Sequence, residues 1–312
     1  MRQRVIGSLT VSIVGLGCNN LGGRLEAAES ERVVRAALDA GVTLFDTADR
    51  YGEGRSEEIL GAALGDRRDE AIIATKFGLQ MGDDPARQGA SPDWITTAVE
   101  DSLRRLGTDY IDLYQLHRPD EDVPIEETLG ALDELVHAGK VREIGCSNFS
   151  GRQIDEAETA ARDHALARFV SAQNHWNLLH RDVEDEVIPA CRRHGLAVLP
   201  YYPLASGVLT GKYELGEEPP PGTRLGSIPR ERAQRFLNEE NLRTTAELES
   251  FAERRGHTLL ELAISWLASD DVVASVIAGA TTPDQVHANV AAAGWELPPD
   301  DRREIDQITS QA

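Results

Sequence analysis

Cysteine is scarce in this chain, and long apolar runs are absent. The three cysteines, Cys18, Cys146 and Cys191, form no paired framework and no metal-type spacing. No apolar run reaches the roughly 18 residues that a membrane helix needs, and residues 1–10 lack the apolar stretch of a signal peptide. We therefore expect a soluble protein of the reducing cytoplasm, with no membrane partner.

Positive charge is also in short supply. Lys and Arg number 32 against 53 Asp and Glu, which gives a formal net charge of −21 and argues against a nucleic-acid or anionic-membrane partner. The acidic residues are spread along the chain, as in a solvated outer surface. Almost all the positive charge is Arg, because lysine occurs only at Lys76, Lys140 and Lys212. A lysine inside an apolar run is therefore conspicuous.

Short β-branched runs alternate with helical patterns along the whole chain, and this alternation predicts parallel βα units. The expected strands are residues 11–17, 42–47, 71–77, 111–117, 141–147, 169–176, 196–203 and 272–280. Helical patterns follow most of them, for example residues 57–64, 125–138, 150–165 and 183–194. Ser91 and Pro92 predict the start of another helix, and Gly107 its end.

Eight such units without a break in composition predict a single α/β domain over residues 1–312, a closed (β/α)8 TIM barrel. We expect a short hairpin at residues 3–9 before it and an extra C-terminal helix at residues 298–311. A doubly wound sheet is the structural alternative. It would need a glycine fingerprint after the first strand, and residues 15–20 (GLGCNN) lack its third glycine.

The connection over residues 204–237 is unusually long and contains Pro219-Pro220-Pro221-Gly222. Loops beyond about 12–15 residues in a compact domain are usually functional or disordered. This one leaves the carboxyl end of the seventh strand, where a barrel places its active site, so we expect a lid over a ligand. A plain surface excursion is the alternative.

Three consecutive expected strands end in a polar side chain, and these are Asp46, Lys76 and His117. Tyr51 follows Asp46 by five residues. Because the carboxyl ends of barrel strands share one face, the four side chains are expected to converge there. Taken singly, each has an ordinary explanation: a helix cap, a lysine that extends to solvent from a strand end, a core histidine.

The chemistry of these four groups is complementary. A phenol has a pKa near 10, and a nearby ammonium lowers it while a carboxylate keeps the ammonium in place. Tyr51 is thus predicted to be a general acid, Lys76 its electrostatic partner and Asp46 the anchor of Lys76. His117 is expected to donate a hydrogen bond to a substrate oxygen.

The motifs that hold these residues resemble those of the aldo-keto reductase family. Residues 45–57 (FDTADRYGEGRSE), 74–78 (ATKFG) and 116–118 (LHR) match its signatures in order, and the similarity covers nearly the whole chain. The resemblance implies carbonyl reduction, or the reverse oxidation, with Asp46, Tyr51, Lys76 and His117 as the catalytic residues.

The resemblance also implies a nicotinamide cofactor. Ser147, Asn148 and Gln173 match the residues that hold its carboxamide, and Tyr201 matches the aromatic that stacks on its ring. The remaining implied contacts lie near the ends of strands one, seven and eight: Cys18, Asn19, Pro203, Leu204, Ser206, Gly207, Lys212, Ile277, Gly279, Thr281, Gln285 and Asn289.

Cofactor choice is less sharply indicated. Gly279 and Gln285 stand where many relatives carry a base for the 2′-phosphate, and the acidic Asp284 lies between them. Backbone amides at the helix start, together with Thr281 and Gln285, can still bind phosphate without a charge-assisted hydrogen bond. We expect NADP(H) to be preferred and NAD(H) to be possible.

The substrate is expected to be a small aldehyde or ketone. Asn19 and Asn20 would make one wall polar, Trp176 is a wall or a core residue, and Arg224 and Arg230 could attract an anion or be solvated. The expected assembly is a monomer or a small homo-oligomer.

Two other function classes compete with the reductase. One is a non-catalytic, redox-sensing nicotinamide-binding subunit on the same fold. The other is a metal-dependent barrel hydrolase, for which only His117 and His175 stand near strand ends. We expect no metal.

Overall fold

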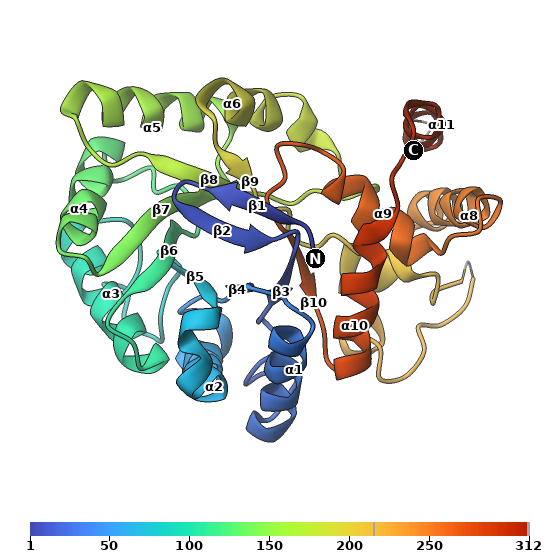
Figure 1. The fold of residues 1–312 in the computed structure, drawn as a ribbon, viewed down its shortest axis with the longest axis horizontal. Helices are drawn as coiled ribbons and strands as arrows, with labels where there is room; N and C mark the ends of the chain where they lie inside the picture. Colours follow the sequence, from blue (N-terminus) through green and yellow to red (C-terminus); the bar gives the residue numbers. More distant parts are fainter. Residues whose placement is uncertain (215, 311–312) are drawn as a thin grey trace.

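The computed structural model describes residues 1–214 and 216–310, and it is an eight-stranded parallel β/α barrel (Figure 1). The strand order is β10-β3-β4-β5-β6-β7-β8-β9. A parallel bridge between Val198 and Val273 joins the two ends of this order and closes the ring. The strands are β3 (Val14–Gly17), β4 (Leu44–Asp46), β5 (Ile72–Phe77), β6 (Ile111–Leu116), β7 (Val141–Ser147), β8 (Phe169–Gln173), β9 (Ala197–Val198) and β10 (Val276–Gly279).

The expected N-terminal hairpin is present, but it takes part of the predicted first strand. β1 (Gln3–Ile6) pairs antiparallel with β2 (Leu9–Ser12), and the barrel strand β3 begins only at Val14. The hydroxyl of Ser12 donates to the carbonyl of Val14 at 2.7 Å, where the chain changes partner. The apolar pattern continues across this bend, so periodicity alone gave one strand for residues 11–17.

The hairpin closes the amino-terminal end of the barrel. Ile6, Leu9 and Val11 are buried, and they form one cluster with barrel residues such as Leu44 and Leu113. Because this end is filled by apolar side chains, the open end of the barrel is the one at which the strands terminate. The polar side chains that follow the strands lie at that open end.

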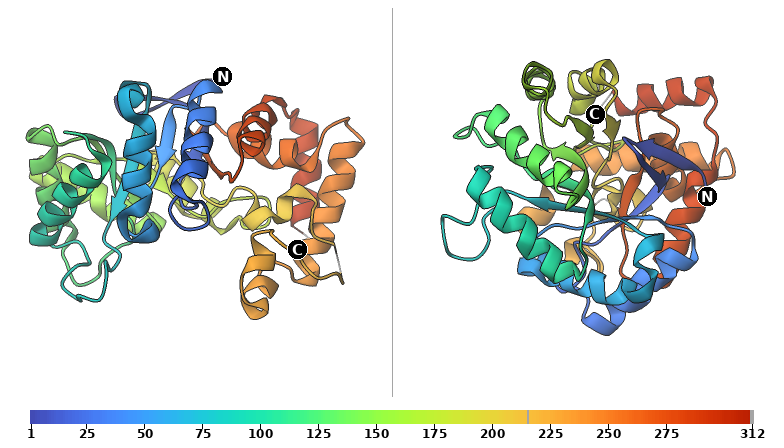
Figure 2. Two further views of the ribbon diagram at one scale, coloured as in Figure 1. Left: turned by 90° about the horizontal axis from the view of Figure 1, so that it is seen from below. Right: turned by 60° about the vertical axis from the view of Figure 1, so that its left-hand side comes forward.

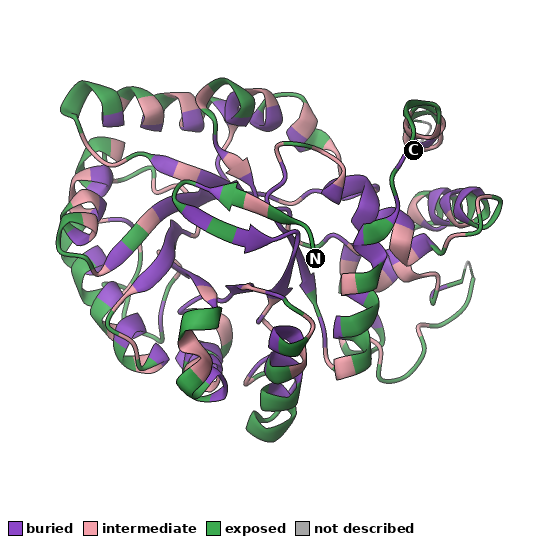
Figure 3. Cartoon of the chain, in the orientation of Figure 1, coloured by how far each residue is buried: buried purple, intermediate pink, exposed green. Residues whose placement is uncertain are grey.

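The outer layer consists of helices that turn one apolar face to the strands, as Figure 3 shows for the buried faces of α1–α6. α3 illustrates the local signals: the hydroxyl of Ser91 accepts from the amide of Trp94, and Gly107 ends the helix at φ 64°. The helices of the first six units are α1 (Ala27–Asp39), α2 (Arg55–Leu64), α3 (Pro92–Leu106), α4 (Ile125–His137), α5 (Gly151–His164) and α6 (Val187–His194).

The long connection after β9 contains more structure than expected. A short helix, α7 (Arg230–Gln234), lies within it, and α8 (Glu239–Glu253) and α9 (Leu259–Ala268), for which we expected no elements, follow it. These elements extend to one side of the barrel (Figure 2). Both α8 and α9 begin at a residue that caps the helix. Asn238 accepts from the amide of Asn241 at the start of α8, and Thr258 forms a capping box with Glu261 at the start of α9.

The chain ends in α10 (Pro283–Ala291) and α11 (Pro299–Thr309). Thr282 caps α10 as expected. The extra C-terminal helix is confirmed, although residue 311 of the predicted range lies outside the described residues. Arg255 of the α8–α9 connection pairs with Asp301 and Glu304 of α11. No helix among the described residues has the length and apolarity that crossing a membrane requires.

Candidate active site

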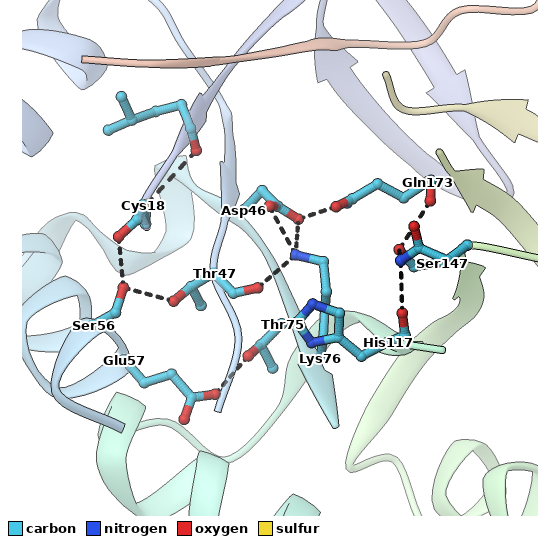
Figure 4. A network of polar contacts seen from close by, with 12 residues as sticks. Cys18, Asp46, Thr47, Ser56, Glu57, Thr75, Lys76, His117, Ser147 and Gln173 are labelled. Atoms are coloured by element: carbon cyan, nitrogen blue, oxygen red, sulfur yellow. Dashed lines mark hydrogen bonds and ion pairs between the residues drawn. The ribbon is translucent and has the colours of Figure 1, made fainter. Parts of the chain in front are cut away.

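The floor of the site is a buried ion pair at the carboxyl ends of β4 and β5 (Figure 4). The ammonium of Lys76 donates to both carboxylate oxygens of Asp46, at 2.7 and 2.8 Å, and to the carbonyl of Thr47 at 2.8 Å. Lys76 is 0% exposed and Asp46 is 2% exposed. Asp46 accepts a further hydrogen bond from the side-chain amide of Gln173, at the end of β8. The predicted anchoring of Lys76 by Asp46 is therefore present.

A second buried pair supports this floor from behind. Glu57 of α2 accepts from the hydroxyl of Thr75, next to Lys76, at 2.5 Å and from the guanidinium of Arg105 at 2.7 Å. Gly54 makes room for this contact, because a Cβ there would lie 2.5 Å from Cδ of Arg105. Gly54 also has φ 92°, a value that favours glycine. The polar motif after Tyr51 thus holds α2 against β5.

Tyr51 begins a 3₁₀ turn, Tyr51–Gly54, between β4 and α2. The ammonium of Lys76 lies 5.2 Å from the centre of its ring, and the ring of His117 meets it edge-on with centroids 6.0 Å apart. Tyr51, Asp46 and His117 all line one cavity. The four predicted catalytic residues are therefore brought together at the open end of the barrel.

The electrostatics of Tyr51 differ from the expectation. Its pKa lies well above the usual value of 10.0, because burial by the surrounding protein disfavours the phenolate and the Asp46 carboxylate disfavours it further. We expected Lys76 to lower this pKa, but the charge of Lys76 is matched by the carboxylate that binds it. Tyr51 is consequently a phenol, with its proton in place, at neutral pH.

His117 directly follows β6 and is neutral. Burial, together with the nearby charges of Lys76 and Arg118, lowers its pKa to about 3. Its Nδ1 is buried and has no hydrogen-bond partner among the described residues. The side-chain amide of Asn148 donates to the carbonyl of His117 at 2.9 Å and so ties β6 to the loop after β7.

The residues expected to hold the carboxamide form one hydrogen-bonded group. The hydroxyl of Ser147 donates to the backbone carbonyl of Gln173 at 2.9 Å, and the amide of Asn148 donates to Ser147 at 3.0 Å. The phenol of Tyr201 donates to Asn148 at 2.7 Å. Asn148 adopts φ 59°, a left-handed backbone conformation that asparagine tolerates better than most residues. Serine, two amides and one aromatic ring thus stand side by side on the cavity wall.

The cavity has a volume of about 740 Å³, within the range of roughly 300–1,000 Å³ that is usual for small-molecule and cofactor sites. Fifteen of the sixteen predicted cofactor residues line it: Asn19, Ser147, Asn148, Gln173, Tyr201, Pro203, Leu204, Ser206, Gly207, Lys212, Ile277, Gly279, Thr281, Gln285 and Asn289. Cys18 differs from the expectation, because its side chain is fully buried and its thiol points to the carbonyl of Leu16.

Several lining residues were not predicted from the sequence, and three arginines are important for the charge of the cavity wall. Arg24 and Arg118 were not considered, whereas Arg224 was expected either to attract an anion or to be solvated, and the structure places it on the cavity wall. Together with Lys212 they give the wall four cations, none of which forms an ion pair with a carboxylate among the described residues. The sequence gives the net charge of −21 but not which cations lack a carboxylate partner, so these residues could be recognised only from their positions in the structure.

The structure also answers whether Trp176 is a wall or a core residue. Trp176 is a core residue: it is 3% exposed, packs edge-on against Trp266 and donates to Glu184. Residues 1–214 and 216–310 hold no cluster of three His, Cys, Asp or Glu side chains that could bind a metal ion. The donor set of a metal-dependent hydrolase is thus not found in the described part of the chain.

Comparisons with known proteins agree with this geometry. The profile of the Aldo/keto reductase family matches residues 13–310. The chain is 37% identical to the aldo-keto reductase YhdN of Bacillus subtilis over 310 residues, which cover 96% of this chain and 90% of that protein. It is 38% identical to a probable voltage-gated potassium channel subunit beta of Arabidopsis thaliana, over 91% of this chain and 88% of that one.

Two further relatives carry names that describe enzymes. The L-glyceraldehyde 3-phosphate reductase of Escherichia coli is 34% identical over 94% of this chain and 87% of its own length. The solved structure of a glycerol dehydrogenase from Gluconobacter oxydans superposes with a TM-score of 0.85 at 34% identity, covering 99% of this chain and 95% of that one. This chain belongs to the aldo/keto reductase family, and it is an NAD(P)-dependent oxidoreductase of carbonyl and alcohol groups.

Proposed function

We propose that the protein reduces an aldehyde or ketone to the alcohol, or runs the reverse oxidation, with Tyr51 as the proton donor. The observation that carries the proposal is the position of Tyr51: its ring lies over the buried Lys76–Asp46 pair and faces a cavity that fits a nicotinamide cofactor. Fixed polar groups in a partly enclosed site are what a proton transfer coupled to carbonyl reduction requires.

Tyr51 carries the proton that the product needs. When bound, the nicotinamide supplies a hydride to the carbonyl carbon, and negative charge then develops on the carbonyl oxygen. An alkoxide is a much stronger base than a phenolate, so Tyr51 gives up its proton to it even though its pKa is raised. Three hydrogen bonds prevent the Lys76 ammonium from moving away as charge forms on the Tyr51 oxygen.

His117 positions the carbonyl. Because its pKa is about 3, the ring is uncharged at neutral pH and offers one N–H and one lone pair. A neutral imidazole beside Tyr51 can donate a hydrogen bond to the carbonyl oxygen without competing as an acid. The edge-on contact of the two rings keeps both groups directed at the same space.

The cofactor is proposed to be NADP(H) in preference to NAD(H). Ser147, Asn148 and Gln173 would hold the carboxamide, and Tyr201 would stack on the ring. Arg24, Lys212 and Arg224 supply positive charge for phosphate groups, which Gly279 and Gln285 do not. A 2′-phosphate adds about two negative charges at neutral pH, and three cations that have no carboxylate partner within residues 1–214 and 216–310 favour the ligand that carries it.

A Tyr51→Phe variant tests the reaction. Removing the hydroxyl is expected to lower kcat with a generic aldehyde and NADPH by about 10²–10⁴-fold, with cofactor affinity unchanged. Tyr110→Phe is the matched control, because Tyr110 loses the same hydroxyl outside the cavity. Wild-type turnover by the Tyr51 variant would refute the assignment.

Cofactor preference is tested separately, by fluorescence titration of the wild-type protein with NADPH and NADH. We expect the dissociation constant for NADPH to be the lower one. Tighter binding of NADH would overturn the preference without affecting the assignment of Tyr51.

A further inference from the structure

Arg118 stands at the catalytic end of the cavity and is not used by the reaction described above. It follows His117 in the chain, is exposed and lines the cavity. Its positive charge lies close enough to His117 to help lower the pKa of that ring, and close enough to Tyr201 to offset part of the rise that burial causes in the pKa of that phenol. Its guanidinium has no ion pair and no hydrogen-bond acceptor among the described residues, whereas most exposed arginines here pair with a carboxylate, as Arg192 does with Asp270 and Asp271.

A carboxylate close to Arg118 in sequence is occupied elsewhere. Asp120 accepts from the backbone amide of Ala90 at 2.8 Å and from that of Asp122 at 3.0 Å. These bonds shape the loop after β6 and leave the guanidinium of Arg118 without a partner from its own loop. Arginine presents a planar fork of N–H donors that suits a carboxylate or phosphate.

Arg118 is distinct from the other cations of the wall. Arg24 donates to the carbonyl of Gly222, Arg224 lies over the ring of Tyr202, and a Cβ on Gly207 would lie 2.8 Å from Nζ of Lys212. Those three are therefore associated with the connection after β9, which the cofactor phosphates are expected to contact. Arg118 alone follows β6, beside the group that receives the carbonyl oxygen.

We propose that Arg118 binds an anionic group, a carboxylate or a phosphate, on the carbonyl substrate, so that short negatively charged aldehydes are preferred over neutral ones of the same size. The inference rests on the proposed reduction at Tyr51. In this arrangement His117 binds the carbonyl oxygen of the substrate and Arg118 binds its anionic group. Because the two residues are adjacent in the chain, the carbonyl and the anionic group must be only a short distance apart in the substrate. A protein of net charge −21 repels anions in general, and a local cation at the site offsets this repulsion.

The test compares matched substrates in the wild-type protein and in Arg118→Gln. The pairs are 4-carboxybenzaldehyde with benzaldehyde, and glyceraldehyde 3-phosphate with glyceraldehyde, each with saturating NADPH. We expect the wild-type kcat/KM to favour the charged member of at least one pair. In Arg118→Gln that ratio should fall about tenfold, mostly through KM, because the contact is made before and during the reaction alike.

Two further variants sharpen the result. Arg118→Lys should recover part of the ratio, since it keeps the charge but not the fork. Arg32→Gln, on α1 outside the cavity, removes the same charge and should leave the ratio unchanged. Added salt should raise the wild-type KM for the charged member and have little effect on KM in Arg118→Gln.

The outcomes separate this inference from the proposed function. If neutral aldehydes are reduced in a Tyr51-dependent manner but Arg118→Gln leaves both charge ratios unchanged, the role of Arg118 is refuted and the reduction stands. If only one pair responds, that pair identifies the anionic group as carboxylate or phosphate. A wild-type protein that favours the neutral member of both pairs also refutes it.

Discussion

At the floor of the cavity the ammonium of Lys76 is bound by Asp46 and Thr47, and the guanidinium of Arg105 is bound by Glu57. On its wall, by contrast, Arg24, Arg118 and Arg224 have no carboxylate partner among the described residues. Both regions lie at the same end of the barrel and contain the same types of cation.

The difference follows from burial. A buried charge without a partner is costly, so the floor is stable only with each charge paired and hydrogen-bonded. A cation at the edge of a cavity keeps its water and needs no internal partner. Paired charges therefore set the geometry of the floor, and unpaired ones remain available to an anionic ligand.

The largest effect is expected from Lys76→Met, which removes one member of the paired charges at the floor. The change removes the fixed cation beneath Tyr51 and leaves the Asp46 carboxylate buried with only Gln173 as partner. We expect kcat to fall about 10²–10⁴-fold and the free energy of unfolding to fall by about 3–5 kcal/mol. Urea unfolding and steady-state rates measure the two effects.

A double variant, Asp46→Asn with Lys76→Met, separates stability from activity. It removes the uncompensated charge and should regain much of the lost stability while reduction stays low. Recovery of turnover along with stability would show that the pair acts only through folding.

Arg105→Met tests the supporting pair. Glu57 is 0% exposed, so the loss of its guanidinium partner should lower the free energy of unfolding by about 3 kcal/mol. Glu57→Gln combined with Arg105→Met should restore most of it, because no buried charge is left unpaired. Equal stability of the single and double variants in urea would contradict this account.

A double variant of the cavity wall, Lys212→Gln with Arg224→Gln, should change cofactor binding rather than the free energy of unfolding. We expect the dissociation constant for NADPH to rise about tenfold and that for NADH to rise less. Arg232→Gln, in the same connection but outside the cavity, is the control. If the dissociation constants for NADPH and NADH rise by the same factor, these cations do not contact the 2′-phosphate that distinguishes the two cofactors.

The last prediction concerns the pH dependence of stability and comes from Asp49, a buried carboxyl group that is not part of either ion pair. Neither of its carboxyl side-chain oxygens has a hydrogen-bond partner in the described part of the chain, and burial and the nearby Glu57 raise its pKa to about 8. The folded state thus keeps a proton that the unfolded state loses near pH 4, so this group's stabilising contribution falls as the pH rises from about 4 to about 8. The slope is at most about 1.4 kcal/mol per pH unit.

Asp49→Asn should remove that slope, because the amide stays neutral throughout. Urea unfolding at several values between pH 5 and pH 8 measures the difference between the two proteins. Parallel curves would show that Asp49 does not bind this proton in the folded state.

The strands that carry Asp46, Lys76 and His117 could be predicted because each is a short apolar run ended by a polar residue. Parallel strands of a barrel end on one face, so this order sufficed to bring the four side chains together. Most of the cofactor contacts that the family resemblance implied also line the cavity, since they follow strand ends. The hairpin boundary at Ser12 was misplaced because a bend within an apolar run leaves periodicity intact.

Properties that depend on several distant groups could not be predicted. The pKa of Tyr51 is raised rather than lowered, because burial and Asp46 outweigh the effect expected of Lys76. Arg24 lines the cavity and donates a hydrogen bond to the carbonyl of Gly222, which lies nearly two hundred residues later, in the connection after β9. Cys18 turns into the core although its neighbour Asn19 lines the cavity.

The sequence by itself determined the barrel, the direction of its open end and the candidate catalytic side chains, since local periodicity and strand-end position carry that information. Only the tertiary structure decided which charges are paired, which pKa values shift and in which direction, and which arginines face the cavity. Those quantities depend on burial and on the distances between residues far apart in the chain, and neither is a local property of the sequence.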